Sequence, residues 1–505
     1  MRFPRSAGLL CHITSLPGPD GIGDLGTPSM AFVDFLAEAG QTIWQILPLS
    51  PPAEGNSPYS AYSAFAGNPL MINLQELVAA GLLADDDVSR DTTADDSGSL
   101  SEVDFETVGR RKQKLLRLAY EQAKTGEPED WRAQRQEFEN CQADWLDDFA
   151  RYEVLLNHFD EPNWSKWPAE WAGRAPEAMA ELESSFSDEL AFSKFKQFVF
   201  DQQWRALKQY ANQRNVRLYG DMPIFVAHES ADVWSNRNLF ALRPDGSPAL
   251  VAGVPPDYFS KTGQLWGNPQ YDWDAIEATD FAWWTRRFSR ALEQFDMLRV
   301  DHFRGFEAYW EVPAEARTAV GGSWVPGPGG KPFRAAEKVL GELPLVAEDL
   351  GLITEGVHQL RDELGFPGMR VLQFGFDNPD DDFHRPSAFP QHSVAYTGTH
   401  DNDTVMGWYR NRLNGPAKTS LPPEDLLHQV LTGDEPVHWQ LVGSVWQSPA
   451  DTVIAPVQDI LGLGNDARMN LPGQAKGNWA WRMTPGALTS ETAARLRQLT
   501  EQAGR

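Results

Sequence analysis

Cysteine is almost absent from this sequence, because 505 residues contain only Cys11 and Cys141. Two cysteines so far apart fit a reducing compartment better than a disulfide framework. Long apolar runs are also missing. The N-terminal segment "MRFPRSAGLLCHITSLPG" contains an apolar run that is too short for a signal sequence. No run in the sequence approaches the roughly 18 apolar residues that span a bilayer. We therefore expect a soluble cytoplasmic protein that does not insert into a membrane.

Basic residues are scarce relative to acids. The chain has 44 Lys and Arg against 71 Asp and Glu, which gives a net charge of -27 at pH 7. Because proteins bind nucleic acid by neutralising its phosphates with basic side chains, this charge argues against a nucleic-acid partner. The acidity suits a solvated surface in a salty cytoplasm, or it serves solubility alone. It identifies no substrate.

Aromatic residues, in contrast, are plentiful, with 19 Trp and 27 Phe. Most of them are expected in the core. The remainder could serve a ligand such as a sugar ring, which presents apolar faces beside polar groups. With 41% hydrophobic residues, the chain can bury either several cores or one large barrel with insertions.

Predicted helices alternate with short β-rich runs, which is typical of parallel strands joined by helical crossovers. A helix is predicted over about 28–39, followed by a Gly40 stop and the strand "TIWQILPL". From about 75 to 185 the pattern changes to an acidic stretch and helical segments with few strand signals, which indicates a helical insertion. The alternation resumes with a long amphipathic helix before the strand "VRLYGDMPIFV".

Four of the predicted strands end in an acidic residue. These acids are Asp221, Asp301, Glu348 and Asp401. In parallel α/β barrels the catalytic groups gather at the carboxyl ends of the strands. The four carboxylates are therefore expected to converge.

The stretch "RVDHFRG" places Arg299 two residues before Asp301. Strand side chains alternate between faces, so both should point inward while Leu298 and Val300 point toward the helices. A neighbouring arginine favours the ionised carboxylate, which is the form that a nucleophile needs. A single pair of this kind is more often structural, but four convergent acids favour catalysis.

Glycosidic bond cleavage uses such carboxylates without a metal. One carboxylate attacks the anomeric carbon and a protonated carboxyl donates to the leaving oxygen, the two being about 5 Å apart in retaining enzymes. We assign Asp301 as the nucleophile. Glu348 follows the apolar run "LPLV", which could raise its pKa toward neutrality and let it act as acid and base. Asp401 would grip sugar hydroxyls and stabilise the oxocarbenium-like transition state.

Several long blocks carry a family resemblance. They are "GLLCHITSLPG", "WQILPLSP", "SPYSAYSAFAGNP", "GVPPDYFSKTGQLWGNPQYDW", "RVDHFRG", "VAEDLG", "YTGTHDND" and "NLPGQAKGNWAWR". Between about residue 5 and residue 483 the chain resembles the 4-α-glucanotransferase family, also called amylomaltase or disproportionating enzyme, which is glycoside hydrolase family 77 of the α-amylase superfamily.

The resemblance implies an α/β fold, a (β/α)8 TIM barrel with inserted, largely helical subdomains and no C-terminal β-domain. We expect a single catalytic barrel over 1–505, a helical insertion over about 75–185 and a smaller insertion over about 226–280 that carries an active-site lid loop. The implied activity is transfer of α-1,4-glucan segments from a donor maltooligosaccharide, starch or glycogen chain to the 4-hydroxyl of an acceptor, through a covalent glycosyl-aspartate.

Matched position by position, the family's nucleophile, acid/base and transition-state stabiliser fall on Asp301, Glu348 and Asp401. Other matched positions bind the substrate or support the nucleophile: Tyr59, Asp221, Gln264, Trp266, Arg299, His400 and Asn470. His302 either orients a sugar or caps the strand end. The loop "GVPPDYFSKTGQLWG", with Tyr258, Phe259 and Trp266, could form an apolar lid that excludes water.

A metal is not expected, because the histidines near the acids lack an HExxH pattern or a Cys/His cluster. No cofactor is expected either. Two alternatives remain: an α-1,4-glucan hydrolase on the same scaffold, and a non-catalytic glucan-binding protein. The oligomeric state does not follow from the sequence.

Overall fold

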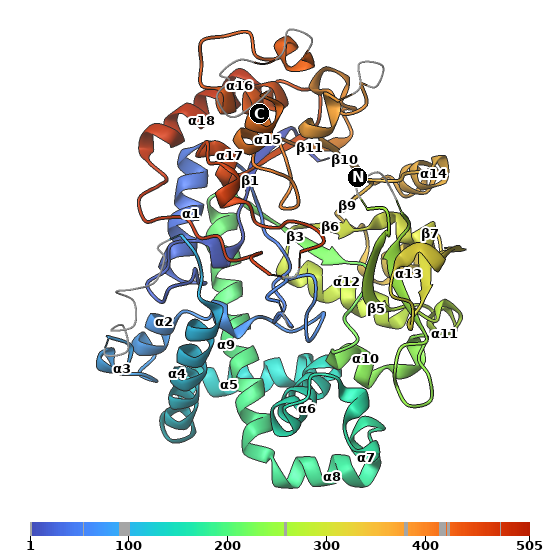
Figure 1. The fold of residues 1–505 in the computed structure, drawn as a ribbon. Helices are drawn as coiled ribbons and strands as arrows, with labels where there is room; N and C mark the ends of the chain where they lie inside the picture. The colour runs from blue at the N-terminus through green and yellow to red at the C-terminus, as the bar shows by residue number, and fades with distance from the viewer. Residues whose placement is uncertain are drawn as a thin grey trace.

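The computed structural model describes residues 3–53, 55–89, 101–256, 260–377, 382–413, 421, 425–474 and 476–505. Its centre is a closed barrel of eight parallel strands in the order β1-β12-β11-β10-β9-β6-β3-β2 (Figure 1). The strands are β1 (Ser6–Leu10), β2 (Ile43–Gln45), β3 (Arg217–Pro223), β6 (Met297–Asp301), β9 (Leu345–Ala347), β10 (Gly368–Val371), β11 (Ser393–Tyr396) and β12 (Thr452–Pro456). The predicted (β/α)8 barrel is confirmed.

Helices that follow the barrel strands surround the barrel. They are α1 (Thr27–Glu38), α9 (Ser187–Gln213), α12 (Ala282–Gln294), α13 (Lys331–Leu340), α14 (Glu355–Leu364), α15 (Val405–Arg412), α16 (Val437–Trp446), α17 (Val457–Ile460) and α18 (Ser490–Gln502). Helix α1 starts one residue before Pro28 and ends shortly before Gly40, whose φ of 70° only glycine adopts freely. Beyond β12, the described residues form no further strand.

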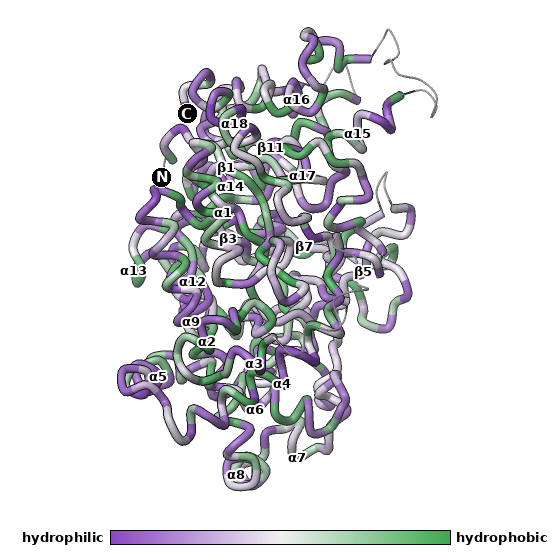
Figure 2. The backbone as a smooth tube through the Cα atoms, turned by 90° about the vertical axis from the view of Figure 1, so that its left-hand side faces the viewer, coloured by the Kyte–Doolittle hydropathy of each residue, from purple (hydrophilic) through white to green (hydrophobic). Residues whose placement is uncertain are grey.

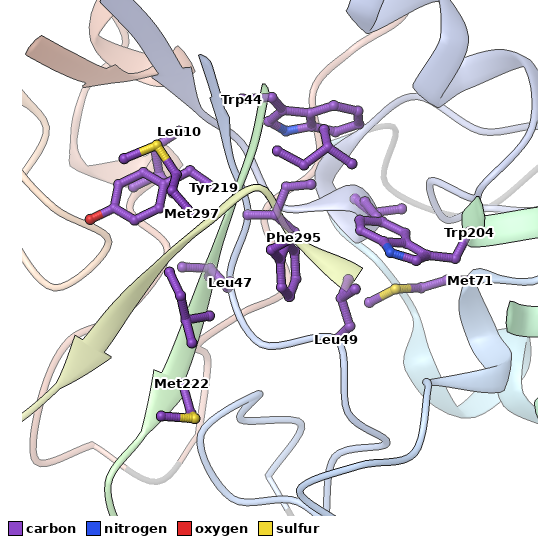
Figure 3. Packing of buried hydrophobic residues seen from close by; sticks show 14 of the residues in the cluster. Leu10, Trp44, Leu47, Leu49, Met71, Trp204, Tyr219, Met222, Phe295 and Met297 are labelled. Carbon is purple, nitrogen blue, oxygen red and sulfur yellow. The ribbon is translucent and has the colours of Figure 1, made fainter. Parts of the chain in front are cut away.

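Large aromatic side chains fill the space between the barrel and its helices (Figure 3). Trp44 of β2 is fully buried, packs edge to face on Phe32 of α1 at 4.9 Å and donates its indole N–H to the Cys11 carbonyl at 2.7 Å. Trp204 of α9 is equally buried and donates to the Gln294 carbonyl at 3.0 Å. Each indole thus buries a large apolar surface with its N–H satisfied. In Figure 2, β1 and α1 are largely hydrophobic, whereas α5 is mostly hydrophilic.

The close approach of β1 to β2 gives a stability prediction. A Cβ at Gly8 would lie 2.3 Å from the backbone oxygen of Ile43, which cannot move without disturbing the strand pair. We expect Gly8→Ala to lower the free energy of unfolding by roughly 1–3 kcal/mol. Chemical denaturation measures this change.

Gly109→Ala is the matched control. Gly109 lies inside the long helix α4 (Phe105–Gly126) with open space around its Cα, so the same substitution should stabilise the protein by roughly 0.5–1 kcal/mol. Equal effects at the two sites would contradict the packing argument.

The described part of 75–185, expected to form a helical insertion, lies in the lower part of Figure 1. Its elements are α2 (Leu74–Ala79), α3 (Asp85–Ser89), α4, α5 (Glu129–Cys141), α6 (Ala143–Phe159), α7 (Ala169–Ala172) and α8 (Pro176–Ser185). The described part of this segment contains no strand. Asp104 starts α4 by accepting a hydrogen bond from the Thr107 N–H at 3.0 Å.

The second insertion contributes to a small sheet. A four-stranded antiparallel sheet has the order β5-β4-β7-β8, with β4 (Leu250–Val254), β5 (Gln264–Pro269), β7 (Ala308–Pro313) and β8 (Ser323–Pro326). β4 and β5 belong to the expected segment 226–280, but their partners β7 and β8 follow the barrel strand β6. The described ends of the segment expected as a lid loop therefore lie in β4 and β5. None of the described helices is both long and apolar enough to cross a membrane.

Candidate active site

Arg299 connects two acids inside the barrel. β6 directs Arg299 and Asp301 to one face, while Leu298 and Val300 are fully buried among apolar side chains on the other. The Arg299 guanidinium donates from Nη1 to both Asp221 oxygens at 2.9 and 2.7 Å, and Nη2 lies 2.7 Å from Asp301 Oδ1. Burial alone would lower the pKa of Arg299, but the two carboxylates raise it well above its usual value. The predicted inward Arg–Asp pair is present.

Asp221 lies within β3, two residues before its end, and not at the strand terminus. Its side chain is fully buried, held by Arg299 and by the Tyr59 hydroxyl, which donates to Oδ2 at 2.8 Å. Burial raises the pKa of Asp221 above its usual value, against the opposing charge of Arg299. In this position Asp221 orients Arg299 and Tyr59 and presents no surface to a ligand. The expectation of a sugar contact from Asp221 does not fit this geometry.

Asp301 is the last residue of β6, and its side chain is 27% exposed. The next residue, His302, has a φ of 51° and turns the chain into a short 3-10 helix. Positive φ is uncommon outside glycine, although histidine adopts it more readily than most residues. The turn leaves the Asp301 carboxylate facing the open end of the barrel and directs the His302 N–H toward Glu348.

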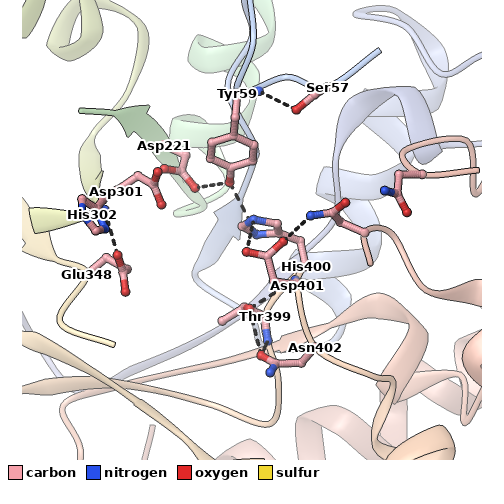
Figure 4. Close-up of polar contacts among 12 residues, drawn as sticks. Ser57, Tyr59, Asp221, Asp301, His302, Glu348, Thr399, His400, Asp401 and Asn402 are labelled. Carbon is pink, nitrogen blue, oxygen red and sulfur yellow. Dashed lines mark hydrogen bonds and ion pairs between the residues drawn. The ribbon is translucent and has the colours of Figure 1, made fainter. Parts of the chain in front are cut away.

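Glu348 directly follows β9 and lies beside Asp301 (Figure 4). The register pairs Val300 with Ala347, so Asp301 and Glu348 are the next residues on adjacent strands. Neighbouring strands lie about 4.8 Å apart, a backbone spacing that lets two side chains approach to the roughly 5 Å that separates the carboxyls of retaining glycosidases. The Glu348 carboxylate accepts from the His302 N–H at 2.8 Å and from the Leu350 N–H at 2.9 Å. Both oxygens are therefore fixed.

The pKa of Glu348 is raised to about 7. Burial is the largest cause, and the negative charge of Asp301 adds to it, against the lowering effects of Arg299 and the two backbone N–H groups. A carboxyl with this pKa exists in both protonation states near neutral pH. The apolar surroundings that the run "LPLV" predicted, and the raised pKa of Glu348 expected from them, are therefore present.

Asp401 lies five residues beyond β11, in a loop, with a side chain that is 43% exposed. Asn470 donates from Nδ2 to Asp401 Oδ1 at 2.6 Å, and His400 Nε2 lies 3.4 Å from Oδ2. Burial opposes ionisation, but His400 and Asn470 hold the pKa of Asp401 well below its usual range. Asp401 is therefore an anion that faces the site.

Tyr59 joins the two sides of the site (Figure 4). Its ring stacks on His400 with 5.0 Å between ring centroids, and its hydroxyl lies 3.5 Å from His400 Nδ1 while donating to Asp221. Trp479, which the sequence analysis did not single out, lies 5.8 Å from Tyr59 and 5.9 Å from His400. This aromatic cluster holds His400 in place next to Asp401.

The β4–β5 hairpin brings Trp266 to the other edge of the site. Its indole is 39% exposed, meets the His302 ring edge to face at 4.8 Å and donates to Gln264 Oε1 at 3.1 Å. Burial lowers the pKa of His302 to about 4, so its ring is neutral near pH 7. The candidate lid residues Tyr258 and Phe259 lie outside the described residues.

Arg468 is a residue that sequence reasoning missed. Its guanidinium donates to the backbone oxygen of Asp401, to the backbone oxygen of Asn470 at 2.6 Å, and to the side chain of Asp403. It thereby fixes both loops that meet at the Asp401 carboxylate. A single arginine in the loop "DARMN" gives no signal of this role, because two of its three partners, Asp401 and Asp403, lie more than sixty residues away in the sequence.

Comparison with known proteins covers nearly the whole chain. A sequence model of the family described as 4-alpha-glucanotransferase matches residues 11–489. Proteins named 4-alpha-glucanotransferase from Thermus thermophilus and Synechocystis sp. are 45% and 44% identical, with 99% of this chain and 99% and 98% of theirs covered. The solved structure of the amylomaltase from Streptococcus agalactiae in complex with acarbose has a TM-score of 0.93 at 36% identity, with 99% of each chain covered. The chain therefore belongs to the 4-alpha-glucanotransferase family, whose members are transglycosylating enzymes.

Proposed function

We propose that this enzyme transfers α-1,4-glucan segments with retention of configuration, through a covalent glycosyl intermediate on Asp301. The donor is a maltooligosaccharide, starch or glycogen chain, and the acceptor is the 4-hydroxyl of another glucan or glucose. The observation that carries the proposal is the position of Asp301 and Glu348 next to each other on adjacent strands. Arg299 holds the Asp301 carboxylate, and the pKa of Glu348 is raised to about 7. This pair of environments matches a nucleophile beside an acid/base.

In the first step Asp301 attacks the anomeric carbon of the donor. A carbon–oxygen bond to Asp301 forms while the glycosidic bond breaks, and protonated Glu348 gives its proton to the departing oxygen. The anionic Asp401 stabilises the positive charge that develops on the sugar ring, because its carboxylate is already fixed by Asn470 and His400. The sugar segment is then an ester of Asp301.

In the second step Glu348, now ionised, takes the proton of the acceptor's 4-hydroxyl. The hydroxyl oxygen attacks the anomeric carbon, and Asp301 leaves as a carboxylate. Water would give hydrolysis through the same step. A bound acceptor has a large effective concentration, and an apolar cover over the site reduces access of water. Trp266, exposed on the β4–β5 hairpin, supports such a cover, with Tyr258 and Phe259 as its proposed further members.

We assign supporting roles to the other residues of the site. Tyr59, Gln264, Trp266, His302, His400 and Asn470 line the sugar subsites, while Asp221 and Arg299 position the nucleophile. The proposal includes one catalytic barrel over 1–505 with insertions over about 75–185 and 226–280. We also propose a cytoplasmic location, in line with the scarcity of cysteine.

A time course with maltotriose tests the function. A transferase produces glucose together with longer oligomers while the number of reducing ends stays constant, because every bond broken is matched by one formed. A hydrolase increases the number of reducing ends steadily. A steady rise that accounts for all the glucose released would reject the transferase in favour of the hydrolase, and an unchanged substrate would leave only glucan binding.

The pKa of Glu348 sets a pH dependence. The first step needs the protonated carboxyl, and the protonated fraction falls as pH rises through about 7. We expect kcat/KM on maltotriose to fall about tenfold per pH unit above that value. A stopped assay across the pH range measures it. A profile that stays flat up to about pH 9 would contradict this role for Glu348.

Arg468 gives a prediction about loop positioning. Arg468→Ala releases the backbone oxygens of Asp401 and Asn470, so the Asp401 carboxylate loses its fixed place. We expect kcat on maltotriose to fall about 100-fold, because a misplacement of about 1 Å can cost that much. Arg468→Lys keeps the charge without the forked donors and should recover only part of the rate. Wild-type kcat in Arg468→Ala would exclude the positioning role.

A further inference from the structure

A second groove lies on the outside of the barrel, between α16 and α18. The two helices are in contact and lie next to one another in Figure 1. The groove has a volume of about 790 Å³, within the range of sites that hold small molecules. The lining residues that carry the argument are Trp439, Gln447, Ser448, Arg495, Gln498 and Gln502.

This groove is separate from the catalytic acids. Ser448, a buried residue of its lining, lies in the turn that leads to the amino end of β12. At that end of the barrel the Ser6 N–H, at the start of β1, donates to the Asp451 oxygen at 2.8 Å. Asp301 and Glu348, in contrast, lie at the carboxyl ends of their strands. A molecule in the groove therefore cannot reach the site of bond cleavage.

The groove has no net charge. Of the described residues that line it, only Arg495 and Glu435 are charged, and they form an ion pair with each other. The Arg495 guanidinium also lies 4.7 Å from the centre of the Trp439 ring, a half-buried side chain that presents its remaining surface to the groove. Neither an anion nor a cation would find an unpaired counter-charge here, so a neutral ligand fits.

Polar groups without partners line the same groove. Among the described residues, the side-chain amides of Gln429, Gln447, Gln498 and Gln502 make no hydrogen bond, and all four are exposed. The Ser448 hydroxyl is buried and likewise has no partner. An unsatisfied buried hydroxyl is unfavourable unless a ligand or water pairs with it. Amides and hydroxyls both donate and accept hydrogen bonds, which matches the hydroxyl groups of a sugar.

We infer that the groove between α16 and α18 is a second, non-catalytic binding site for a neutral α-1,4-glucan chain. The indole of Trp439 contacts the apolar face of a sugar ring, and the glutamine amides and Ser448 bond to its hydroxyls. The choice of an α-glucan rests on the proposed function. A long chain held here stays bound to the enzyme while its free end reaches the catalytic site, which raises the local concentration of that end. A trisaccharide, which occupies only one site at a time, does not gain from this.

Native electrophoresis in gels that contain soluble amylose tests the inference. Trp439→Ala should weaken the apparent affinity about fivefold or more, and the double variant Gln498→Ala/Gln502→Ala should weaken it in the same direction. Both glutamines are exposed, so the double variant should fold. If Trp439→Ala does not fold, the double variant alone tests the site. Trp131→Ala and Gln113→Ala, a half-buried tryptophan and an exposed glutamine on other helices, are the matched controls and should bind as the wild type does.

Transfer from maltotriose separates this inference from the proposed function. We expect kcat/KM on maltotriose to stay within about twofold in the groove variants, because this short donor needs only the catalytic site. Unchanged migration in both groove variants would overturn the inference and leave the transferase intact. If amylose retards the wild type in the gel but the wild type does not process maltotriose, the proposed function alone would be rejected. Trp439→Ala could instead lose self-association in sedimentation while its migration in amylose gels stays unchanged. That result would identify the groove as a contact between subunits and overturn the glucan site.

Discussion

Asp301→Asn is expected to lower transfer from maltotriose below about a thousandth of the wild-type rate. The amide has almost the shape of the carboxylate but lacks the charge needed to attack the anomeric carbon. Neither neighbouring acid can replace it, because Asp221 is fully buried against Arg299 and Glu348 is fixed by two backbone N–H groups. Product analysis by chromatography after long incubation measures the residual rate.

The fold should survive the Asp301→Asn substitution. Arg299 keeps both of its hydrogen bonds to Asp221, so no buried charge loses its only partner. We expect a change in unfolding free energy of about 1 kcal/mol or less, because the Asp301 side chain is partly exposed. Asp362→Asn is the matched control: Asp362 also pairs with an arginine, on α14, and its loss should leave activity unchanged.

A covalent label gives an independent result for Asp301. A fluorinated glucosyl donor that forms the ester but reacts on slowly should add its mass to the peptide that contains Asp301 in the wild type and not in Asp301→Asn. A label on any other carboxylate, or activity above about a thousandth of wild type in the variant, would remove Asp301 from the role of nucleophile.

The barrel part of this site could be predicted because strand geometry is local. Alternation along β6 determines that Arg299 and Asp301 share a face, and an acid after an apolar run is enough to place Glu348 at the end of β9. The same reasoning put Asp221 at a strand end, whereas it lies inside β3 and is sealed by Tyr59 and Arg299. A sequence pattern shows which face a residue occupies but not what covers it.

The loop part of the site could not be predicted from the pattern. Asp401, Arg468 and Asn470 meet through hydrogen bonds between segments more than sixty residues apart, and no local periodicity encodes such contacts. The pairing of β4 with β7 was missed for a similar reason, since it joins strands on either side of β6. The strand pattern placed Asp401 among the convergent acids, but only the family resemblance indicated Asn470, and neither signal gave the hydrogen bond between them.

Glu348→Gln should separate the two halves of the reaction. With maltotriose, whose leaving group needs a proton, we expect a fall of about 1,000-fold or more, because the amide cannot give up a proton. With α-glucosyl fluoride, whose leaving group departs without one, formation of the ester should be largely restored. The acceptor step still lacks its base, so a burst of fluoride followed by slow turnover is expected.

The burst distinguishes a lost proton donor from a damaged site. The amide introduced by Glu348→Gln has one acceptor oxygen, so it can accept only one of the hydrogen bonds that the His302 and Leu350 N–H groups donate to the carboxylate. The variant should therefore also lose about 1–3 kcal/mol of stability. A site disturbed by that loss would be slow with both donors and would show no burst. Glu355→Gln, an exposed acid at the start of α14, should behave as the wild type with both. Equal defects on maltotriose and on the fluoride, without that loss of stability, would remove Glu348 from the role of general acid. A burst limited to the fluoride supports the role, because only the proton distinguishes the two leaving groups.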